Sequence, residues 1–187
     1  MMIKAIVSGL EDDQGRLIIA VDDNLPLNSP ADLQYFRKQT EKSLVVMGRR
    51  TWEHLPKKPL PNRYNAVVTK HRAQSVFTEE QLVDPDIHHF FNVTDSKSLL
   101  RYIEEVATKR NLDTVWIIGG ASLYSLAKDL VDEWYVTIPN PNVDYTGTLV
   151  NSNRKTTLDK FVIFDKCSKL KSITPVDESH SVYVYAR

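Results

Sequence analysis

An acidic residue on an apolar helix face is the first feature of the sequence that could do chemistry. A helix is predicted from Ser29, because serine caps helices and the proline after it is accepted at the first helical position. At roughly 100° of rotation per residue, Asp32, Leu33 and Phe36 share one arc of this helix. A carboxylate beside an aromatic ring suits a flat, nitrogen-rich heterocycle, which would stack on the ring and donate paired hydrogen bonds to the carboxylate. Alternatively, Asp32 closes a capping box with Ser29, and the two roles are compatible.

A second group of residues has the composition of a phosphate site. A predicted buried strand ends at Gly48, and a predicted helix begins with Arg49, Arg50 and Thr51. Backbone N–H groups at a helix start favour an anion, glycine allows close approach, and arginine matches the planar geometry of phosphate. Solvent-exposed arginines are the ordinary alternative for such a pair.

The next predicted strand ends in residues that could join the same site. It closes with Thr69 and is followed by Lys70, which add a hydroxyl group and a cation. If this strand lies beside the first, all of these groups could meet one ligand. A 2′-phosphate on an adenosine ribose fits them and would select NADP over NAD.

A third motif joins a hydrophobic strand to a helix through two glycines. The strand leads into Gly119 and Gly120, and a helix is predicted from Ala121. The glycines leave room for a pyrophosphate at the helix start. The later glycines of the G-x-G-x-x-G fingerprint are missing, and a tight strand-to-helix turn is the alternative.

The elements that would position these motifs alternate between strands and helices. Strands are predicted at 3–8, 43–47, 64–69, 88–93, 114–118, 133–138, 161–168 and 181–185, and 17–21 is a further apolar segment. Helices are predicted at 29–40, 49–55, 94–108 and 121–130, and 139–157 is predicted to be rich in loops. This order predicts an α/β fold, with one domain over 1–187. The fold has a mostly parallel mixed sheet of about eight strands, helices on both faces and an antiparallel C-terminal hairpin. Ligands of such sheets bind at the carboxyl ends of strands.

Composition restricts the class of protein. The chain has 187 residues with 24 basic and 24 acidic side chains, so a nucleic-acid partner is not expected. The one cysteine, Cys167, cannot form an internal disulfide, which suits a reducing compartment. The apolar stretch at 1–10 is too short for a membrane span. We therefore expect a cytoplasmic protein that binds no membrane and holds no metal. We expect a monomer, with a homodimer as the alternative.

Taken together and in order, these segments resemble dihydrofolate reductase. The resemblance rests on 23–26, 30–33 with Phe36, 46–53, 59–63, 118–121 with Tyr124, and 135–137. It spans most of the chain, and only the stretch from about Pro139 matches loosely. The ordered set is far more specific than any single motif.

The resemblance implies a reaction and roles for individual residues. The reaction would be reduction of dihydrofolate by NADPH, with hydride passing from nicotinamide C4 to pterin C6 and a proton reaching N5. It would support one-carbon and thymidylate synthesis. Asp32 would promote that protonation, Thr137 would orient Asp32, and Arg63 would hold the glutamate α-carboxylate. The other implied substrate-binding residues are Ile6, Val7, Leu33, Phe36 and Leu55. The implied cofactor-binding residues are Ala20, Gly48, Arg49, Arg50, Thr51, Thr69, Lys70, Ile118, Gly119, Gly120, Ala121, Ser122 and Tyr124.

Several positions depart from the family pattern. Leu27 stands where the family usually has tryptophan, and leucine cannot hold a water through an N–H group. Ala20 and Asn62 stand at common glycine positions, and Gly147-Thr148 replaces an acid–threonine pair. Two alternatives therefore remain: a related NADPH-dependent reductase of a pyrimidine or another pterin, and a non-catalytic folate-binding or structural homologue.

Overall fold

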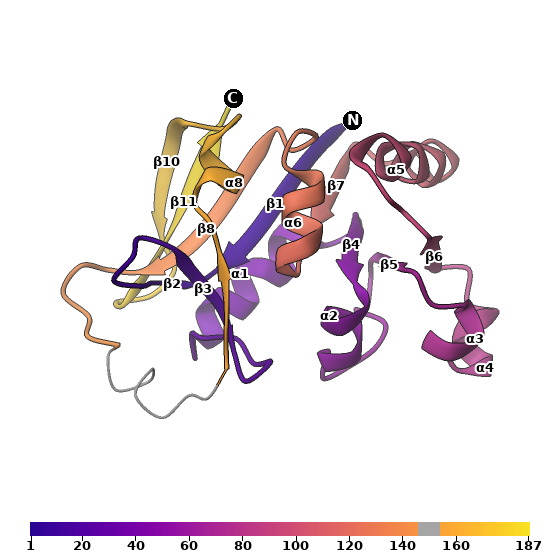
Figure 1. Ribbon diagram of the computed structural model, residues 1–187, viewed down its shortest axis with the longest axis horizontal. Coiled ribbons are helices and arrows are strands. Elements are labelled where there is room, and N and C mark those ends of the chain that lie inside the picture. Colours follow the sequence, from indigo (N-terminus) through magenta and orange to yellow (C-terminus); the bar gives the residue numbers. More distant parts are fainter. Residues whose placement is uncertain (146–153) are drawn as a thin grey trace. The chain divides into compact units, whose positions relative to one another are not determined.

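The computed structural model of the protein describes residues 1–145 and 154–187 (Figure 1). The chain divides into two compact units. Unit 1 contains Met1–Lys4 and Thr40–Leu130, and unit 2 contains Ala5–Gln39 and Val131–Arg187. Both units are thus assembled from segments that are distant in sequence. The pair Gly147-Thr148, which departs from the family pattern, lies outside the described residues.

Unit 1 alternates strands and helices as the sequence predicts. Its complete strands are β4 (Leu44–Gly48), β5 (Tyr64–Thr69), β6 (Ile87–Phe91) and β7 (Thr114–Ile117). Its helices are α2 (Arg49–His54), α3 (Ala73–Val76), α4 (Glu79–Leu82), α5 (Ser96–Arg110) and α6 (Ala121–Ala127). Strand β4 is buried on both faces from Leu44 to Met47, the pattern of a central parallel strand.

Local sequence sets the bounds of helix α5. The side chain of Asp95 accepts a hydrogen bond from the Ser98 amide, and the Ser98 side chain contacts the Asp95 amide in return, which completes a capping box. The helix ends at Asn111, whose φ of 55° is left-handed. Its apolar face is the one that the sequence predicts. The side chains that it buries are Leu99, Ile103, Val106 and Ala107.

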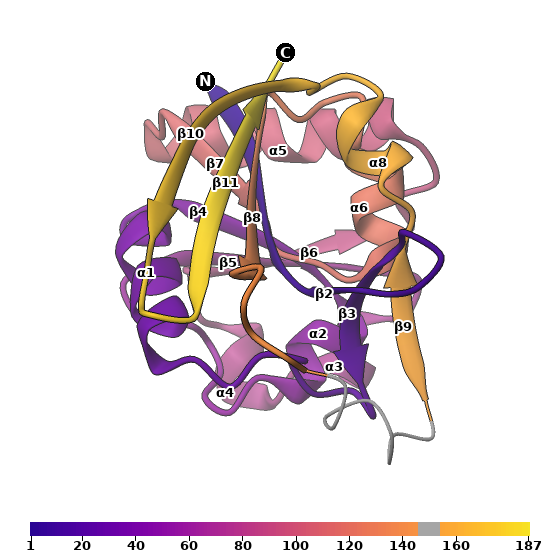
Figure 2. The same cartoon turned by 90° about the vertical axis from the view of Figure 1, so that its left-hand side faces the viewer.

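Unit 2 is richer in strands. Its strands, besides most of β1 (Met2–Ser8), are β2 (Leu10–Glu11), β3 (Leu17–Val21), β8 (Glu133–Pro139), β9 (Lys155–Leu158), β10 (Lys169–Pro175) and β11 (His180–Ala186). Its helices are α1 (Pro30–Thr40, whose last residue belongs to unit 1) and α8 (Phe161–Phe164). Strands β10 and β11 lie side by side as an antiparallel hairpin (Figure 2).

The strands form one large sheet and one small sheet. The large sheet has eight strands in the order β10-β11-β8-β1-β7-β4-β5-β6, and the small sheet has the order β2-β3-β9. The pairs β4–β5, β4–β7 and β5–β6 are parallel, whereas β8–β11 and β10–β11 are antiparallel. This topology confirms the predicted α/β fold and its antiparallel C-terminal strands.

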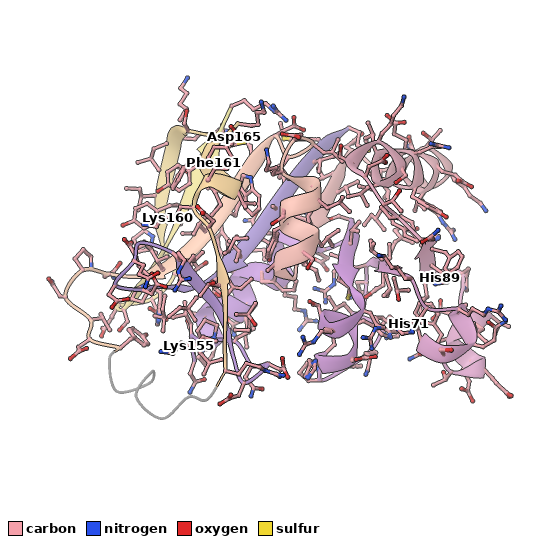
Figure 3. All side chains as sticks on the ribbon, viewed as in Figure 1. His71, His89, Lys155, Lys160, Phe161 and Asp165 are labelled. Carbon is pink, nitrogen blue, oxygen red and sulfur yellow. The ribbon has the colours of Figure 1, made fainter. Side chains whose placement is uncertain are left out.

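The predicted strand at 161–168 is wrong. Residues Phe161–Phe164 instead form the short helix α8, on which Figure 3 labels Phe161. The Asp159 carboxylate accepts a hydrogen bond from the Phe161 amide. Val162 and Ile163 are both buried, although a strand would turn consecutive side chains to opposite faces. The hairpin strand is β10, which begins after the predicted segment.

The predicted loop region at 139–157 also contains a strand that the sequence did not indicate. Strand β9 pairs antiparallel with β3, with Leu158 opposite Leu17. No helix within residues 1–145 and 154–187 is long and apolar enough to span a membrane.

Candidate active site

Unit 2 contains a buried acid, Asp32, in the first turn of α1. Its side chain is only 8% exposed, and its Oδ1 accepts a 2.7 Å hydrogen bond from Thr137 Oγ1. The Asp32 amide donates to Ser29 Oγ over 3.1 Å, so Ser29 caps the helix as predicted. Burial raises the pKa of Asp32, and the Thr137 hydrogen bond opposes that rise. The carboxyl group therefore holds its proton to higher pH than an exposed aspartate does.

We expect Thr137→Val to raise the pKa of Asp32 further. The valine keeps the shape of threonine but removes the hydroxyl donor that stabilises the charged carboxylate. A charge-assisted hydrogen bond is worth about 1.5 kcal/mol or more, which corresponds to roughly one pH unit. Carbon NMR of the Asp32 carboxyl group measures the midpoint, with the exposed-threonine variant Thr174→Val as the control. A midpoint that stays at the parent value would contradict this role of Thr137.

Apolar residues predicted to line a substrate pocket also lie in unit 2. Leu33 follows Asp32 on α1 and is 54% exposed, and Phe36 is partly exposed one turn later. Ile6 and Val7 are buried on β1. Leu33 and Phe36 thus place accessible apolar side chains on the same helix as the acid.

Two departures from the family pattern lie near the small sheet of unit 2. Leu27 is buried and packs with Leu10 and Ile18 in a hydrophobic cluster. Leu27 is therefore a core residue in this protein, and its packing does not require the N–H group of an indole. Ala20, predicted to bind the cofactor, is on β3 opposite Thr156 of β9, beside an irregularity in the pairing.

In unit 1, the two predicted glycine turns meet. Strands β4 and β7 run parallel, with Val46 opposite Ile117; β4 continues directly into α2, and β7 leads into α6 through Ile118 and the two glycines. The Gly48 amide donates a 2.7 Å hydrogen bond to the Gly119 carbonyl group. A Cβ atom added to Gly48 would lie 3.7 Å from both Gly119 O and Gly120 N. We call this junction of Gly48, Gly119 and Gly120 the glycine cradle.

Within the cradle, Gly119 is the position with the least room for a side chain. Gly119 has a φ of 115°, and its added Cβ would lie 3.1 Å from the Tyr124 hydroxyl oxygen. The peptide bond between Gly119 and Gly120 is cis. An added Cβ on Gly120 would lie 3.8 Å from Thr51 Oγ1, so the second turn also borders the helix of the first. Tyr124 is buried, and burial raises the pKa of its hydroxyl group.

The predicted phosphate-binding side chains lie on the elements that border the cradle. Arg49 and Arg50 begin α2, where Arg49 forms a 2.7 Å ion pair with Glu53. Strand β5 pairs with β4, so Thr69 and Lys70 follow the neighbouring strand end. Ile118 precedes the two glycines, and Ala121 and Ser122 begin α6.

Two histidines near this strand end were not among the predicted site residues. His71 directly follows Lys70, and its amide donates to Thr69 Oγ1 over 3.0 Å. His89 of β6 contacts the His71 carbonyl oxygen through Nε2 at 2.9 Å, and Figure 3 labels both rings. The parallel pairing of β5 with β6 brings them together, which a reading of local sequence could not indicate.

Arg63 is buried in unit 1, in contrast to most arginines. Its Nη1 donates to Thr40 Oγ1 over 3.0 Å, and its Nε donates to the Pro61 carbonyl oxygen over 2.9 Å. These two hydrogen bonds fix the orientation of the Arg63 guanidinium plane. The preceding Asn62 adopts a φ of 59°, as expected for a replacement of a turn glycine. Leu55, also predicted to contact substrate, is partly buried just after α2.

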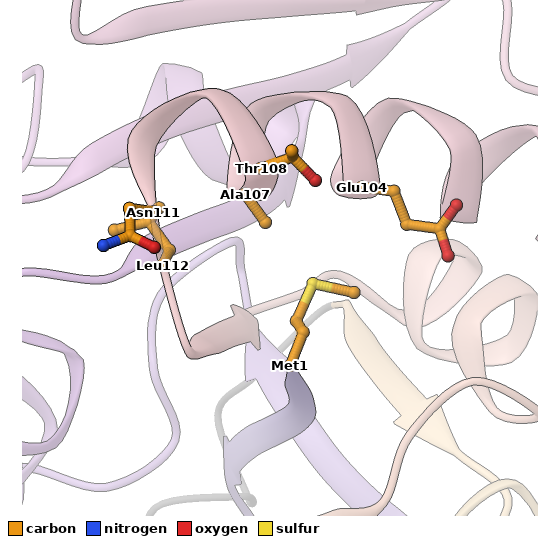
Figure 4. A pocket seen from close by; sticks show the side chains of 6 residues that line it. All are labelled: Met1, Glu104, Ala107, Thr108, Asn111 and Leu112. Atoms are coloured by element: carbon orange, nitrogen blue, oxygen red, sulfur yellow. The ribbon is translucent and has the colours of Figure 1, made fainter.

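A pocket of about 500 Å³ lies elsewhere in unit 1, against helix α5 (Figure 4). Its lining residues are Met1, Glu104, Ala107, Thr108, Asn111 and Leu112. The lining has one acidic and no basic side chain, so it does not match the predicted phosphate-binding residues. Among residues 1–145 and 154–187, no group of three metal-ligating side chains is close enough to hold a metal ion.

The sequence and the fold both match known proteins. The sequence profile of the family described as dihydrofolate reductase matches residues 2–156. The dihydrofolate reductase of Saccharomyces cerevisiae is 31% identical over 150 residues, covering 74% of this chain and 65% of that protein. The dihydrofolate reductase of Bos taurus is 30% identical over 128 residues, covering 59% of this chain and 63% of that protein. The chain thus spans slightly less than two thirds of the length of these relatives.

The fold comparison agrees with the sequence comparison. A solved dihydrofolate reductase from Enterococcus faecalis, complexed with NADP(H) and RAB-propyl, has a TM-score of 0.67. The comparison covers 100% of this chain and 96% of that chain at 22% identity, so it shows the shared fold. Because the family profile covers well over half of the sequence, the protein belongs to the dihydrofolate reductase family.

Proposed function

We propose that this protein reduces 7,8-dihydrofolate to 5,6,7,8-tetrahydrofolate with NADPH. The observation that carries the proposal is the buried Asp32 carboxyl group, held by Thr137 at the start of α1. Such an acid can accept hydrogen bonds from the amino group and ring N–H of a pterin. Membership of the family supplies the reaction to which this acid belongs.

Asp32 would have two tasks in the reaction. Its carboxylate would bind and orient the pterin, while Leu33 and Phe36 supply apolar and stacking surface. Because burial raises the pKa of Asp32, part of the carboxyl population keeps a proton closer to neutral pH. That proton would reach pterin N5, through water. Ile6 and Val7 would complete the apolar lining.

The glycine cradle of unit 1 fits the phosphates of a dinucleotide. Its backbone groups approach each other where any side chain would fill the space. Arg49, Arg50, Thr51, Thr69 and Lys70 would bind the phosphates. Ile118, Ala121, Ser122 and Tyr124 would border the cofactor together with the glycines, and the family resemblance adds Ala20 to the cofactor-binding residues. When bound, NADPH supplies the hydride, so the protein needs no redox group of its own.

We also propose a monomeric, single-domain protein that works in the cytoplasm. The one cysteine, Cys167, is buried, and burial raises the pKa of its thiol. A thiol of this kind is a poor participant in disulfide exchange. Light scattering of the purified protein would measure its mass and reveal a homodimer.

The experiment that tests the proposed activity follows the loss of NADPH absorbance. We expect steady oxidation that requires dihydrofolate. If NADPH is oxidised only with another pterin or with a pyrimidine, the protein is a related reductase. Tight folate binding with no oxidation of NADPH would indicate a non-catalytic homologue.

We expect Arg63→Gln to raise the KM for dihydrofolate about tenfold while kcat changes little. The substitution removes the charge that would pair with the glutamate α-carboxylate, a charge-assisted interaction worth about 1.5 kcal/mol or more. Steady-state kinetics with dihydropteroate, which lacks the glutamate, provides the matched control. An equal loss with both substrates would show that Arg63 supports the fold and does not bind the tail. Arg63→Lys should recover part of the affinity.

A further inference from the structure

A chain of hydrogen bonds behind Asp32 joins three parts of unit 2. Ser29 Oγ, which accepts the Asp32 amide, donates a 2.7 Å hydrogen bond to Asp177 Oδ2. Asp177 Oδ1 contacts His180 Nδ1 at 2.8 Å, and His180 Nε2 contacts the Tyr145 hydroxyl group. The first turn of α1 is therefore tied to the turn between β10 and β11. We call Ser29, Asp177, His180 and Tyr145 the relay.

The middle of the relay is buried and charged. Ser29 is 4% exposed and His180 is 3% exposed, whereas Asp177 is partly exposed. Burial raises the pKa of Asp177, but hydrogen bonds from Ser29, His180 and the Ser179 amide outweigh this effect and hold it at about 2. Asp177 is thus an anion at any physiological pH, with the His180 imidazole directly against it.

The relay and the Thr137 hydrogen bond approach Asp32 from different sides. Thr137 holds the carboxyl group, while Ser29 holds the backbone amide. The two are also linked through the sheet, because β11 pairs with β8 so that Val182 is opposite Thr137. A substitution of His180 can therefore change both the position of Asp32 and the protonation of its carboxyl group.

We propose that Asp177 and His180 are positioning residues for Asp32: through Ser29 they hold the first turn of α1, and they act electrostatically on its carboxyl group. The inference rests on the proposed reductase function. It adds two residues, Asp177 and His180, that neither the motifs nor the family resemblance indicated.

Few titratable groups surround Asp32 and His180, so the electrostatic part of the proposal can be tested. The groups that face Asp32 are Ser8 on β1, Tyr35 on α1, Thr137 on β8, Asp177 in the turn and His180 on β11. Those that face His180 are Asp177, Asp32 and Tyr145. Burial raises the pKa of Tyr35 to about 12 and also raises that of Tyr145, so both phenols stay neutral. The coulombic effects on Asp32 therefore come from Asp177 and His180.

The direction of the electrostatic effect follows from the signs of the charges. Burial is the main cause that raises the pKa of Asp32, and the Thr137 hydrogen bond lowers it. Beyond these, the His180 charge lowers the pKa and the Asp177 charge raises it. Removing the imidazole leaves the anion of Asp177 uncompensated.

The test measures Asp32 in the free protein and in the reaction. We expect His180→Asn to raise the carboxyl NMR midpoint of Asp32 by at least about half a pH unit. The alkaline limb of the kcat/KM profile should move in the same direction. His180→Asn combined with Asp177→Asn should return the midpoint toward the parent value, because both opposing charges are gone. A merely structural role would not produce this return.

Two further variants separate position from charge. Ser29→Ala changes no charge, so it should speed hydrogen exchange of the Asp32 amide while leaving the midpoint near the parent value. His88→Asn removes a half-buried imidazole from unit 1 that makes none of these contacts, and should leave both readouts unchanged. His180→Gln is a second substitution that removes the charge if His180→Asn does not fold.

The inference and the proposed function can fail separately. A parent protein that reduces dihydrofolate, with an Asp32 midpoint that His180→Asn and His180→Gln leave unchanged, would overturn the inference alone. A parent protein that shows no reduction would overturn the proposed function. The titration and exchange measurements on the free protein would still support or overturn the physical link between the relay and Asp32.

Discussion

Replacing Asp32 by asparagine is expected to lower kcat/KM for dihydrofolate at least about tenfold, or ~1.4 kcal/mol of barrier. The amide has the size of the carboxyl group and can still meet Thr137 Oγ1. It cannot carry the negative charge that pairs with the pterin, and it has no titratable proton to pass toward N5. Steady-state NADPH oxidation by both proteins measures the loss.

The same substitution should increase stability at neutral pH, which separates chemistry from folding. The pKa of Asp32 in the folded protein is raised above its ordinary value, mainly by burial. The charged carboxylate therefore destabilises the fold above the folded pKa, and this cost disappears as the pH falls below it. Asparagine avoids the cost, so urea unfolding should show a gain that is present at neutral pH and absent in acid. A variant that loses activity and stability together would make Asp32 a structural residue.

Gly119→Ala is expected to weaken NADPH binding more than tenfold and to lower the free energy of unfolding by about 1–3 kcal/mol. At a φ of 115°, a residue with a side chain is strained, and its Cβ would lie 3.1 Å from the Tyr124 hydroxyl oxygen. Because Tyr124 is buried, it has little freedom to move away. Fluorescence titration with NADPH and urea unfolding measure the two effects.

Gly15→Ala provides the matched control for backbone strain. Gly15 also has a positive φ, of 74°, but an added Cβ would meet nothing within 4 Å. This variant should lose about 1 kcal/mol of stability and keep the parent affinity for NADPH. If Gly119→Ala behaves the same way, the cradle is only a tight turn, the alternative that the isolated motif leaves open.

The sequence predicts those parts of the fold that local pattern determines. The strands before Gly48 and Gly119 are continuous apolar runs, and such runs are recognisable because both faces of a central parallel strand are buried. The segment at 161–168 has the same β-branched and aromatic composition, yet it forms helix α8 and a loop. The hydrogen bond from the Phe161 amide to the Asp159 carboxylate and the burial of consecutive side chains favour the helix.

The site was predictable only where its residues belong to motifs. The resemblance paired Asp32 with Thr137, and the structure brings these two side chains into contact across 105 positions of sequence. The relay could not be predicted, because Ser29 and Asp177 are 148 positions apart and the capping motif at Ser29 does not indicate its partner. Long-range pairing of β8, β10 and β11 created that contact. The roles of the predicted binding residues and the single-domain organisation stay predictions.

The most direct test of the central claim is a single turnover with NADPH that carries deuterium at the transferred C4 position. We predict tetrahydrofolate with one deuterium at C6, formed as fast as NADPH is oxidised and much more slowly by Asp32→Asn. Folded protein that binds NADPH but forms no deuterated product, or that oxidises NADPH without labelling C6, would contradict the assignment of this chain as a dihydrofolate reductase.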